Sequence, residues 1–255
     1  MKRSISFLIL LVIIELATAD YALAQSRDKA KYSVKHLKNG TIILDDFEDD
    51  TLGSLPHKWY NRDGKRQPIN YPPDEKQTYK YRIMREGGNQ FLHYEGTSAK
   101  HMNFPIVNKA GIDIYKTPIL TWKWRVTQIP QGANEDDNDK NDVAASIYVV
   151  FDMGRVALFK KVPKSIRYTW SSTLKKGTEL SKFFGNQKII VLQSGKEGLG
   201  KWHTFQRNIV EDYKRLFGDD PPKKPLAILI LSDGDSTGHR AVADYDDIEL
   251  CPMMY

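Results

Sequence analysis

The sequence predicts an all-β domain, a two-sheet antiparallel β-sandwich of jelly-roll type with one short helix near 208–217. Short segments rich in β-branched and aromatic residues recur along the chain, separated by glycine, proline and acidic residues. In PILTWKWRV (118–126), apolar residues alternate with Thr121, Lys123 and Arg125, which is typical of a half-buried antiparallel strand. NIVEDYKRLFG has helical spacing instead. Together these patterns predict about ten short strands and a single helix.

Each element is predicted from its local pattern. GTIILDDFEDD gives a first strand over 41–47, and the glycines and prolines of 52–76 indicate a loop. The pair Gly87-Gly88 marks a hairpin turn. ASIYVVFDM is almost entirely apolar, which predicts a strand buried on both faces. Further strands are expected at YKYRIMR, QFLHYEG, VALFKKV, SIRYTWSST, KIIVLQSG, KWHTFQRNI, PLAILILSD and AVADYDDIEL.

The N-terminal segment has the pattern of an export signal. Two basic residues precede the apolar run 7–14, and ALA at 22–24 provides the small residues that a signal peptidase cleaves after. The run is shorter than the roughly 20 apolar residues that span a bilayer, so a retained anchor is the weaker alternative. We therefore expect a signal peptide over 1–24, a polar lead-in over 25–39 and a single β-sandwich domain over 40–252. The mature protein is predicted to be periplasmic or secreted, with no membrane span.

Composition narrows the partners and the chemistry. The formal net charge is +6, but the basic residues are scattered, and no basic helix accompanies them, which argues against nucleic-acid binding. Mild basicity is compatible with acidic glycans or lipid headgroups. Cys251 is the only cysteine, so no intramolecular disulfide can form. The sequence has no phosphate-binding glycine loop, HExxH, GxSxG or CxxC motif, and we predict no organic cofactor and no catalytic residue.

Acidic residues gather where the domain begins and ends. The first strand finishes with Asp46 and Glu48, and the last strand carries Asp246 and Asp247. If these strands lie side by side, their carboxylates would repel one another unless a cation lay between them. Calcium suits such a place because it accepts about six to eight oxygen ligands in loose geometry. The four residues are therefore predicted ligands of a structural Ca²⁺, and solvated strand ends are the alternative.

Two resemblances extend these predictions. DDFED and YDDIEL are similar to the end motifs of galactose-binding-like, jelly-roll carbohydrate-binding sandwiches, which implies a structural calcium between the first and last strands. LTWKWRV, DVAASIYVVF, IRYTWSST, RNIVEDYKRLFG and LILSDGDSTGHRAVADYDDIEL, in this order, resemble a bacterial exported family known only as domain of unknown function 3047. The second resemblance covers most of the mature chain. It implies one β-rich domain and no assigned activity.

The loop SDGDSTGH combines Asp233 and Asp235 with His239, a mixture that can bind a ligand or an ion or supply acid and base groups. Gly234 and Gly238 favour a tight turn in which aspartate and serine side chains bond the backbone. We include the three residues in the predicted ligand-binding set, and turn chemistry and catalysis remain alternatives.

A second acidic stretch, NEDDNDKND (134–142), has the alternate acidic spacing of a calcium loop. Its sixth position lacks glycine and its twelfth lacks glutamate, so the calcium-loop assignment fails. The stretch is predicted to be a mobile acidic loop.

A polar groove is predicted on one sheet face, lined by Arg125, Tyr148, Arg167 and Trp170. The sequence thus favours an exported, non-catalytic protein that binds a glycan or another cell-envelope ligand. One alternative is a glycoside hydrolase or polysaccharide lyase, in which residues of the SDGDSTGH loop act with Arg125 and Tyr148. The other is a scaffold or assembly protein of the envelope. The patterns predict no oligomeric state.

Overall fold

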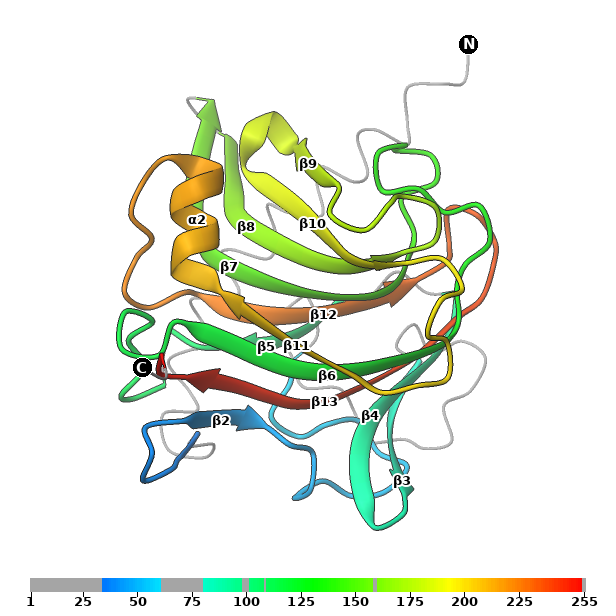
Figure 1. Ribbon diagram of the computed structural model, residues 1–255, viewed down its shortest axis with the longest axis horizontal. Coiled ribbons are helices and arrows are strands. Elements are labelled where there is room, and N and C mark those ends of the chain that lie inside the picture. The colour runs from blue at the N-terminus through cyan, green and yellow to red at the C-terminus, as the bar shows by residue number, and fades with distance from the viewer. Residues whose placement is uncertain (1–33, 61–79, 98–100, 108, 158–159, 254–255) are drawn as a thin grey trace.

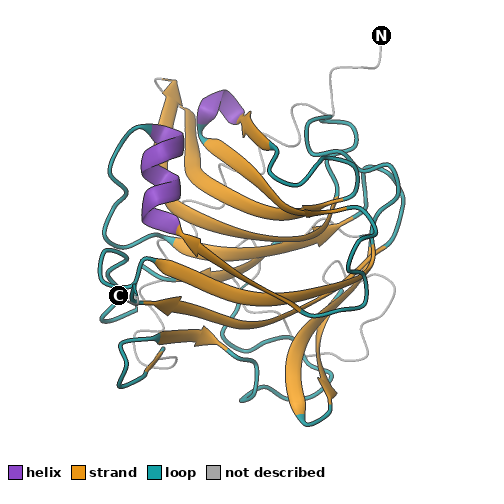
Figure 2. Cartoon of the chain, viewed as in Figure 1, coloured by secondary structure: helices purple, strands orange, loops and turns teal. Residues whose placement is uncertain are grey.

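The computed structural model describes residues 34–60, 80–97, 101–107, 109–157 and 160–253 (Figure 1). The described residues are mostly β, with 49% of them in strands and 6% helical. Two sheets stack face to face, and one α-helix lies against one end of the stack (Figure 2). The predicted two-sheet sandwich is confirmed, and the described residues contain one α-helix, as expected. The expected signal peptide lies outside the described residues.

The first sheet is organised around the last strand of the chain. β13 pairs with β6 along one side, and with β4 and then β2 along the other. Its strands are β1 (Lys35–His36), β2 (Ile42–Asp45), β3 (Tyr81–Glu86), β4 (Asn89–Gly96), β6 (Ile119–Gln128), β11 (His203–Asn208) and β13 (Ala241–Cys251). The pairing of β2 with β13 places the first and last strands of the predicted domain side by side. The hairpin predicted at Gly87-Gly88 joins β3 to β4.

The second sheet has the order β5-β12-β7-β8-β10-β9. Its strands are β5 (Met102–Pro105), β7 (Val143–Ala157), β8 (Lys160–Ser171), β9 (Glu179–Lys182), β10 (Gln187–Ser194) and β12 (Ala227–Asp233), and a short 3₁₀ turn, η1 (Phe183–Gly185), follows β9. β8 and β10 run parallel, so the sheet is not antiparallel throughout as predicted. The inserted β9 makes this possible because it carries the chain across before β10 begins.

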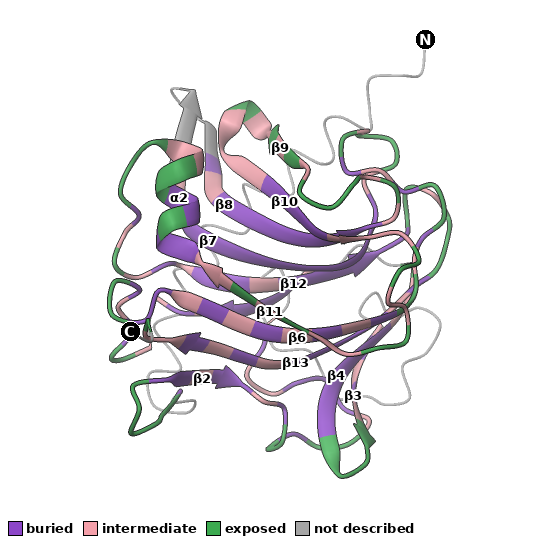
Figure 3. Ribbon diagram, viewed as in Figure 1, coloured by how far each residue is buried: buried purple, intermediate pink, exposed green. Residues whose placement is uncertain are grey.

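The core lies between the two sheets, and both contribute alternate residues to it (Figure 3). On β6, Leu120, Trp122, Trp124 and Val126 are fully buried while the residues between them are half-buried, which confirms the predicted alternation. The Trp122 ring lies 5.5 Å from the Trp124 ring and 5.4 Å from the Tyr168 ring of the opposite sheet. Aromatic packing thus joins the sheets directly.

The helix α2 (Ile209–Phe217) begins and ends where the sequence predicts. The side chain of Asn208 accepts hydrogen bonds from the first backbone N–H groups, and Gly218 ends the helix with a φ of 75°. Asp212 faces inward and accepts hydrogen bonds from Arg207 of β11 and from the hydroxyl of Tyr168 on β8. This carboxylate ties the helix to both sheets.

Candidate binding site on the outer face of the second sheet

Strand alternation divides β7 and β8 into an inner face and an outer face. Ile147 and Val149 of β7, with Ile166 and Tyr168 of β8, belong to the core between the sheets. Because successive side chains point to opposite faces, Tyr148 and Arg167 point outward. The two residues are register partners on the antiparallel β7–β8 pair. The structure therefore brings together two of the four residues predicted to line a groove.

Arg167 is buried on this outer face, with only 2% of its surface exposed. Its guanidinium carbon lies 5.3 Å from the centre of the Tyr148 ring, and Nη1 donates to Oδ1 of Asn141 at 3.2 Å. Nε and Nη2 have no hydrogen-bond partner in the described part of the chain. Burial alone would lower the pKa of Arg167, but Tyr148 and Glu135 nearby raise it overall, so the side chain stays charged.

Three carboxylates lie beside this pair at the end of β12. Asp142, Asp233 and Asp235 each place an oxygen within 4.8 Å of the others, so the group could hold a metal ion. Burial raises the pKa of Asp233 well above its ordinary value, and Asp142 and Asp235 raise it further, whereas Arg167 opposes the rise. A bound cation would relieve this repulsion.

The SDGDSTGH loop is held by a carboxylate that lies outside it in the sequence. Asp142 accepts hydrogen bonds from the backbone N–H groups of Ser236 and Thr237 at 3.0 and 2.7 Å. A Cβ on Gly234 would lie 1.7 Å from the carbonyl oxygen of His239, so only glycine fits there. His239 itself is exposed and follows the turn 235–238. Asp233 and Asp235 thus reach the site, and His239 does not belong to its buried part.

The stretch 134–142, predicted to be mobile, is instead docked on the outer face. Glu135 is fully buried and accepts hydrogen bonds from the hydroxyls of Ser171 at 2.6 Å and Thr169 at 3.3 Å. Asn141 contacts Arg167, as described above. The prediction was wrong because these attachments join residues more than 25 positions apart, which local acidic spacing does not reveal. We call Glu135, Asp142, Tyr148, Arg167 and Asp233 the outer-face cluster.

The other two groove residues lie elsewhere, so the four-residue groove does not form. Trp170 is three positions after Arg167 and therefore points inward, where it is fully buried and donates to the carbonyl of Gly195. Arg125 belongs to β6 of the first sheet. Trp59, which lies in the segment 52–76 that was expected to be a loop, is also buried, and its ring centre lies 5.5 Å from that of Phe104.

Arg125 is paired with two carboxylates on the outer face of the first sheet. Nε donates to Asp244 at 2.7 Å and Nη1 donates to Glu86 at 2.6 Å. The guanidinium also lies 4.9 Å from the centre of the Trp202 ring and 5.3 Å from that of Phe91. Arg125 is therefore a structural cation with little capacity left for a ligand.

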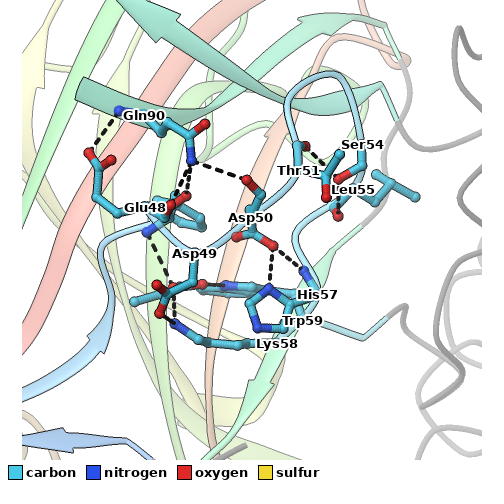
Figure 4. A network of polar contacts seen from close by, with 12 residues as sticks. Glu48, Asp49, Asp50, Thr51, Ser54, Leu55, His57, Lys58, Trp59 and Gln90 are labelled. Carbon is cyan, nitrogen blue, oxygen red and sulfur yellow. Dashed lines mark hydrogen bonds and ion pairs between the residues drawn. The ribbon is translucent and has the colours of Figure 1, made fainter. Parts of the chain in front are cut away.

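At the predicted calcium site, the amide group of Gln90 occupies the turn after β2 (Figure 4). Its nitrogen donates to the carbonyl oxygens of Phe47, Glu48 and Asp50 at 3.0, 2.9 and 3.1 Å. The backbone N–H of Gln90 donates to Oε1 of Glu48 at 2.8 Å. Carbonyl oxygens that could coordinate a cation converge here on a neutral amide.

The remaining predicted calcium ligands also have protein partners. Asp246 accepts a hydrogen bond from Asn89 at 2.8 Å, and Asp247 forms a 2.5 Å ion pair with Lys123. Asp46 accepts from the backbone N–H of Glu48 at 3.4 Å. An ion at this place would have to compete with the Lys123 ammonium. Calcium binding there stays a prediction.

A family model described as protein of unknown function (DUF3047) matches residues 58–249. The chain belongs to this family. The match runs from Trp59 and its neighbours to the last residues of β13, so it includes every member of the outer-face cluster. Among curated proteins, none matches.

Several solved structures are similar to this chain at low sequence identity. The family 11 carbohydrate-binding module of a Clostridium thermocellum cellulase is 11% identical, with 89% of this chain and 98% of that chain covered and a TM-score of 0.40. A family 28 module specific for non-crystalline cellulose is 14% identical, with coverages of 86% and 96% and a TM-score of 0.39. An exo-β-agarase is 12% identical over 84% of this chain and 25% of that chain, with a TM-score of 0.42. At these TM-scores the fold class rests on the chain's own two sheets.

In the part of the chain that the structure describes, no helix is both long and apolar enough to cross a membrane.

Proposed function

We propose that this DUF3047 protein is an exported, non-catalytic binding protein that takes a cell-envelope glycan at the outer-face cluster. The observation that carries the proposal is the meeting of Tyr148, Arg167 and Asp233, an aromatic ring, a cation and a carboxyl group held on paired strands of one sheet. Ligand sites typically combine apolar walls with a few precisely placed polar groups. Val143 and Leu231 pack against Tyr148 and supply such a wall.

The cluster is rigid, which favours binding. Glu135 is fixed by Ser171 and Thr169, and Asp233 accepts the backbone N–H of Val143 at 2.8 Å. Side chains locked by such bonds lose little conformational entropy when a ligand arrives.

Export is the second part of the proposal, and it is supported by the N-terminal pattern of the sequence.

A hydrolase is the second candidate, and one observation favours it. Burial raises the pKa of Asp233, as an acid catalyst of glycoside cleavage requires, and Asp235 lies close by. The partners expected from the sequence are not assembled, since Arg125 lies on the other sheet and His239 is exposed. Release of reducing ends from an envelope polysaccharide, lost in Asp233→Asn, would establish this candidate in place of the first.

The glycan proposal predicts direct binding by the purified protein. On an array of envelope and extracellular polysaccharides, the wild type is expected to bind at least one class, and Tyr148→Ala is expected to weaken that binding by about tenfold or more. Trp202→Ala is the matched control, because the Trp202 ring lies against Arg125 of the first sheet, and this variant should bind as the wild type does. Absence of binding to every glycan by the folded protein would refute the proposal.

A structural calcium completes the proposal, and we propose Asp142, Asp233 and Asp235 as its ligands because their carboxylate oxygens lie within 4.8 Å of one another. Added calcium is expected to raise the thermal midpoint of EDTA-treated protein, since a ligand at about 100 times its Kd stabilises the folded state by about 2.7 kcal/mol. Asp235→Asn should abolish the increase and Asp247→Asn should keep it. The opposite pattern would place the ion between the strand ends, and no increase in the wild type would exclude both sites.

A further inference from the structure

We infer that the ligand carries a carboxylate, as in a uronic-acid sugar, and presents it to the Nε and Nη2 edge of Arg167. The inference rests on the proposed function and specifies its ligand class. It starts from one observation: these two nitrogens are buried and have no hydrogen-bond partner among the described residues. Unpaired donors in such a position cost free energy until an acceptor reaches them.

The geometry of Arg167 leaves one edge of the guanidinium unused. Nη1 donates a hydrogen bond to Oδ1 of Asn141, and the guanidinium packs against the ring of Tyr148 on one side. The remaining Nε and Nη2 donate in parallel, an arrangement that matches the two oxygens of a carboxylate. A neutral hydroxyl would offer these two donors a single oxygen and no negative charge.

Another arginine of the same chain shows what this edge binds. Arg207 presents its Nε and Nη2 to the two oxygens of Asp212, with Nε to Oδ2 at 2.8 Å. Arg125 likewise pairs its Nε with Asp244. Where these arginines are partly buried, the fold supplies a carboxylate to the Nε edge. At Arg167 the fold supplies none from its described residues, so the carboxylate is left for the ligand.

The nearby acidic groups do not substitute for a bound anion. Glu135 uses its oxygens on Ser171 and Thr169, and Asp233 uses Oδ1 on the backbone N–H of Val143. They influence Arg167 through space and form no hydrogen bond with it in the described structure. A buried cation without a bonded counterion is unfavourable because its charge has lost its hydration. A ligand carboxylate would pair with the Arg167 guanidinium, and their attraction is strong in a low-dielectric site.

The test compares uronic-acid oligosaccharides with their carboxyl-reduced, neutral counterparts by calorimetry. The wild type is expected to bind the acidic form at least about tenfold more tightly. Arg167→Met and Arg167→Lys should lose this preference, and Arg125→Lys is the control that should retain it. A sulfated glycan serves as a further arm, and equal binding of sulfated and uronic-acid chains would overturn the carboxylate assignment.

Stability measurements separate a ligand role from a structural one. Because Arg167→Met removes a buried charge whose edge is unpaired, we expect its thermal midpoint without ligand to equal or exceed that of the wild type. A lower midpoint would show that the fold itself pairs Arg167 and would overturn the inference. Equal binding of neutral and acidic forms would refute the inference alone, whereas failure of every glycan to bind would refute the proposed function with it.

Discussion

Replacing Gln90 with leucine is expected to lower the free energy of unfolding by about 3–5 kcal/mol. The side-chain amide nitrogen of Gln90 donates hydrogen bonds to the carbonyls of Phe47, Glu48 and Asp50. The side-chain oxygen of Gln90 accepts a hydrogen bond from Arg85 at 2.8 Å. Each buried polar group left without a partner costs about 1–3 kcal/mol, and leucine can satisfy none of them. The turn also holds Phe47 at a φ of 55°, a left-handed conformation that needs support from its surroundings.

Urea unfolding of the purified protein measures this effect. Gln193→Leu is the matched control, because the Gln193 side chain is half-buried and donates one hydrogen bond, to the carbonyl of Glu197 at 3.0 Å. It should cost about 1 kcal/mol or less. Similar small losses in both variants would mean that the turn after β2 does not depend on the Gln90 amide.

The turn also shows what the sequence could and could not predict. Alternation of apolar residues placed Trp122 and Trp124 in the core, and helical spacing placed α2, because both signals are local. Gln90 follows its three carbonyl partners by 40 to 43 positions. No local pattern distinguishes it from an ordinary polar residue of a hairpin.

The candidate site was predictable to a similar extent. Tyr148 and Arg167 meet because both alternate with core residues on adjacent strands, and the same alternation excludes Trp170, which lies an odd number of positions from Arg167. Sheet membership, which separates Arg125 from them, depends on long-range strand pairing. The docking of Glu135 depends on it too, since Ser171 lies 36 positions away.

The stability of the folded protein is expected to depend on pH through the carboxyl group of Asp246. Burial raises the pKa of Asp246 from its ordinary 3.8 to about 7, Asp247 raises it too, and the hydrogen bond from Asn89 opposes the rise. The folded state therefore binds this proton more tightly than the unfolded state does. Its contribution to stability is fully present below about pH 4 and is lost as the pH rises toward 7. At about 1.4 kcal/mol for each tenfold change, the loss is at most about 4 kcal/mol.

Asp246→Asn removes this contribution and leaves every other carboxyl group in place. Measured by urea unfolding in EDTA, the variant is expected to gain stability relative to the wild type between pH 4 and pH 8, by about 2–4 kcal/mol. Asp220→Asn is the control: its carboxylate is exposed and its ion pair with Lys214 is screened by solvent, so its effect should change far less over the same pH range. An equally small change for Asp246→Asn would mean that Asp246 is ionised in the folded protein at low pH. The Lys123 ammonium, which is already paired with Asp247, would then have to stabilise the carboxylates of both Asp246 and Asp247.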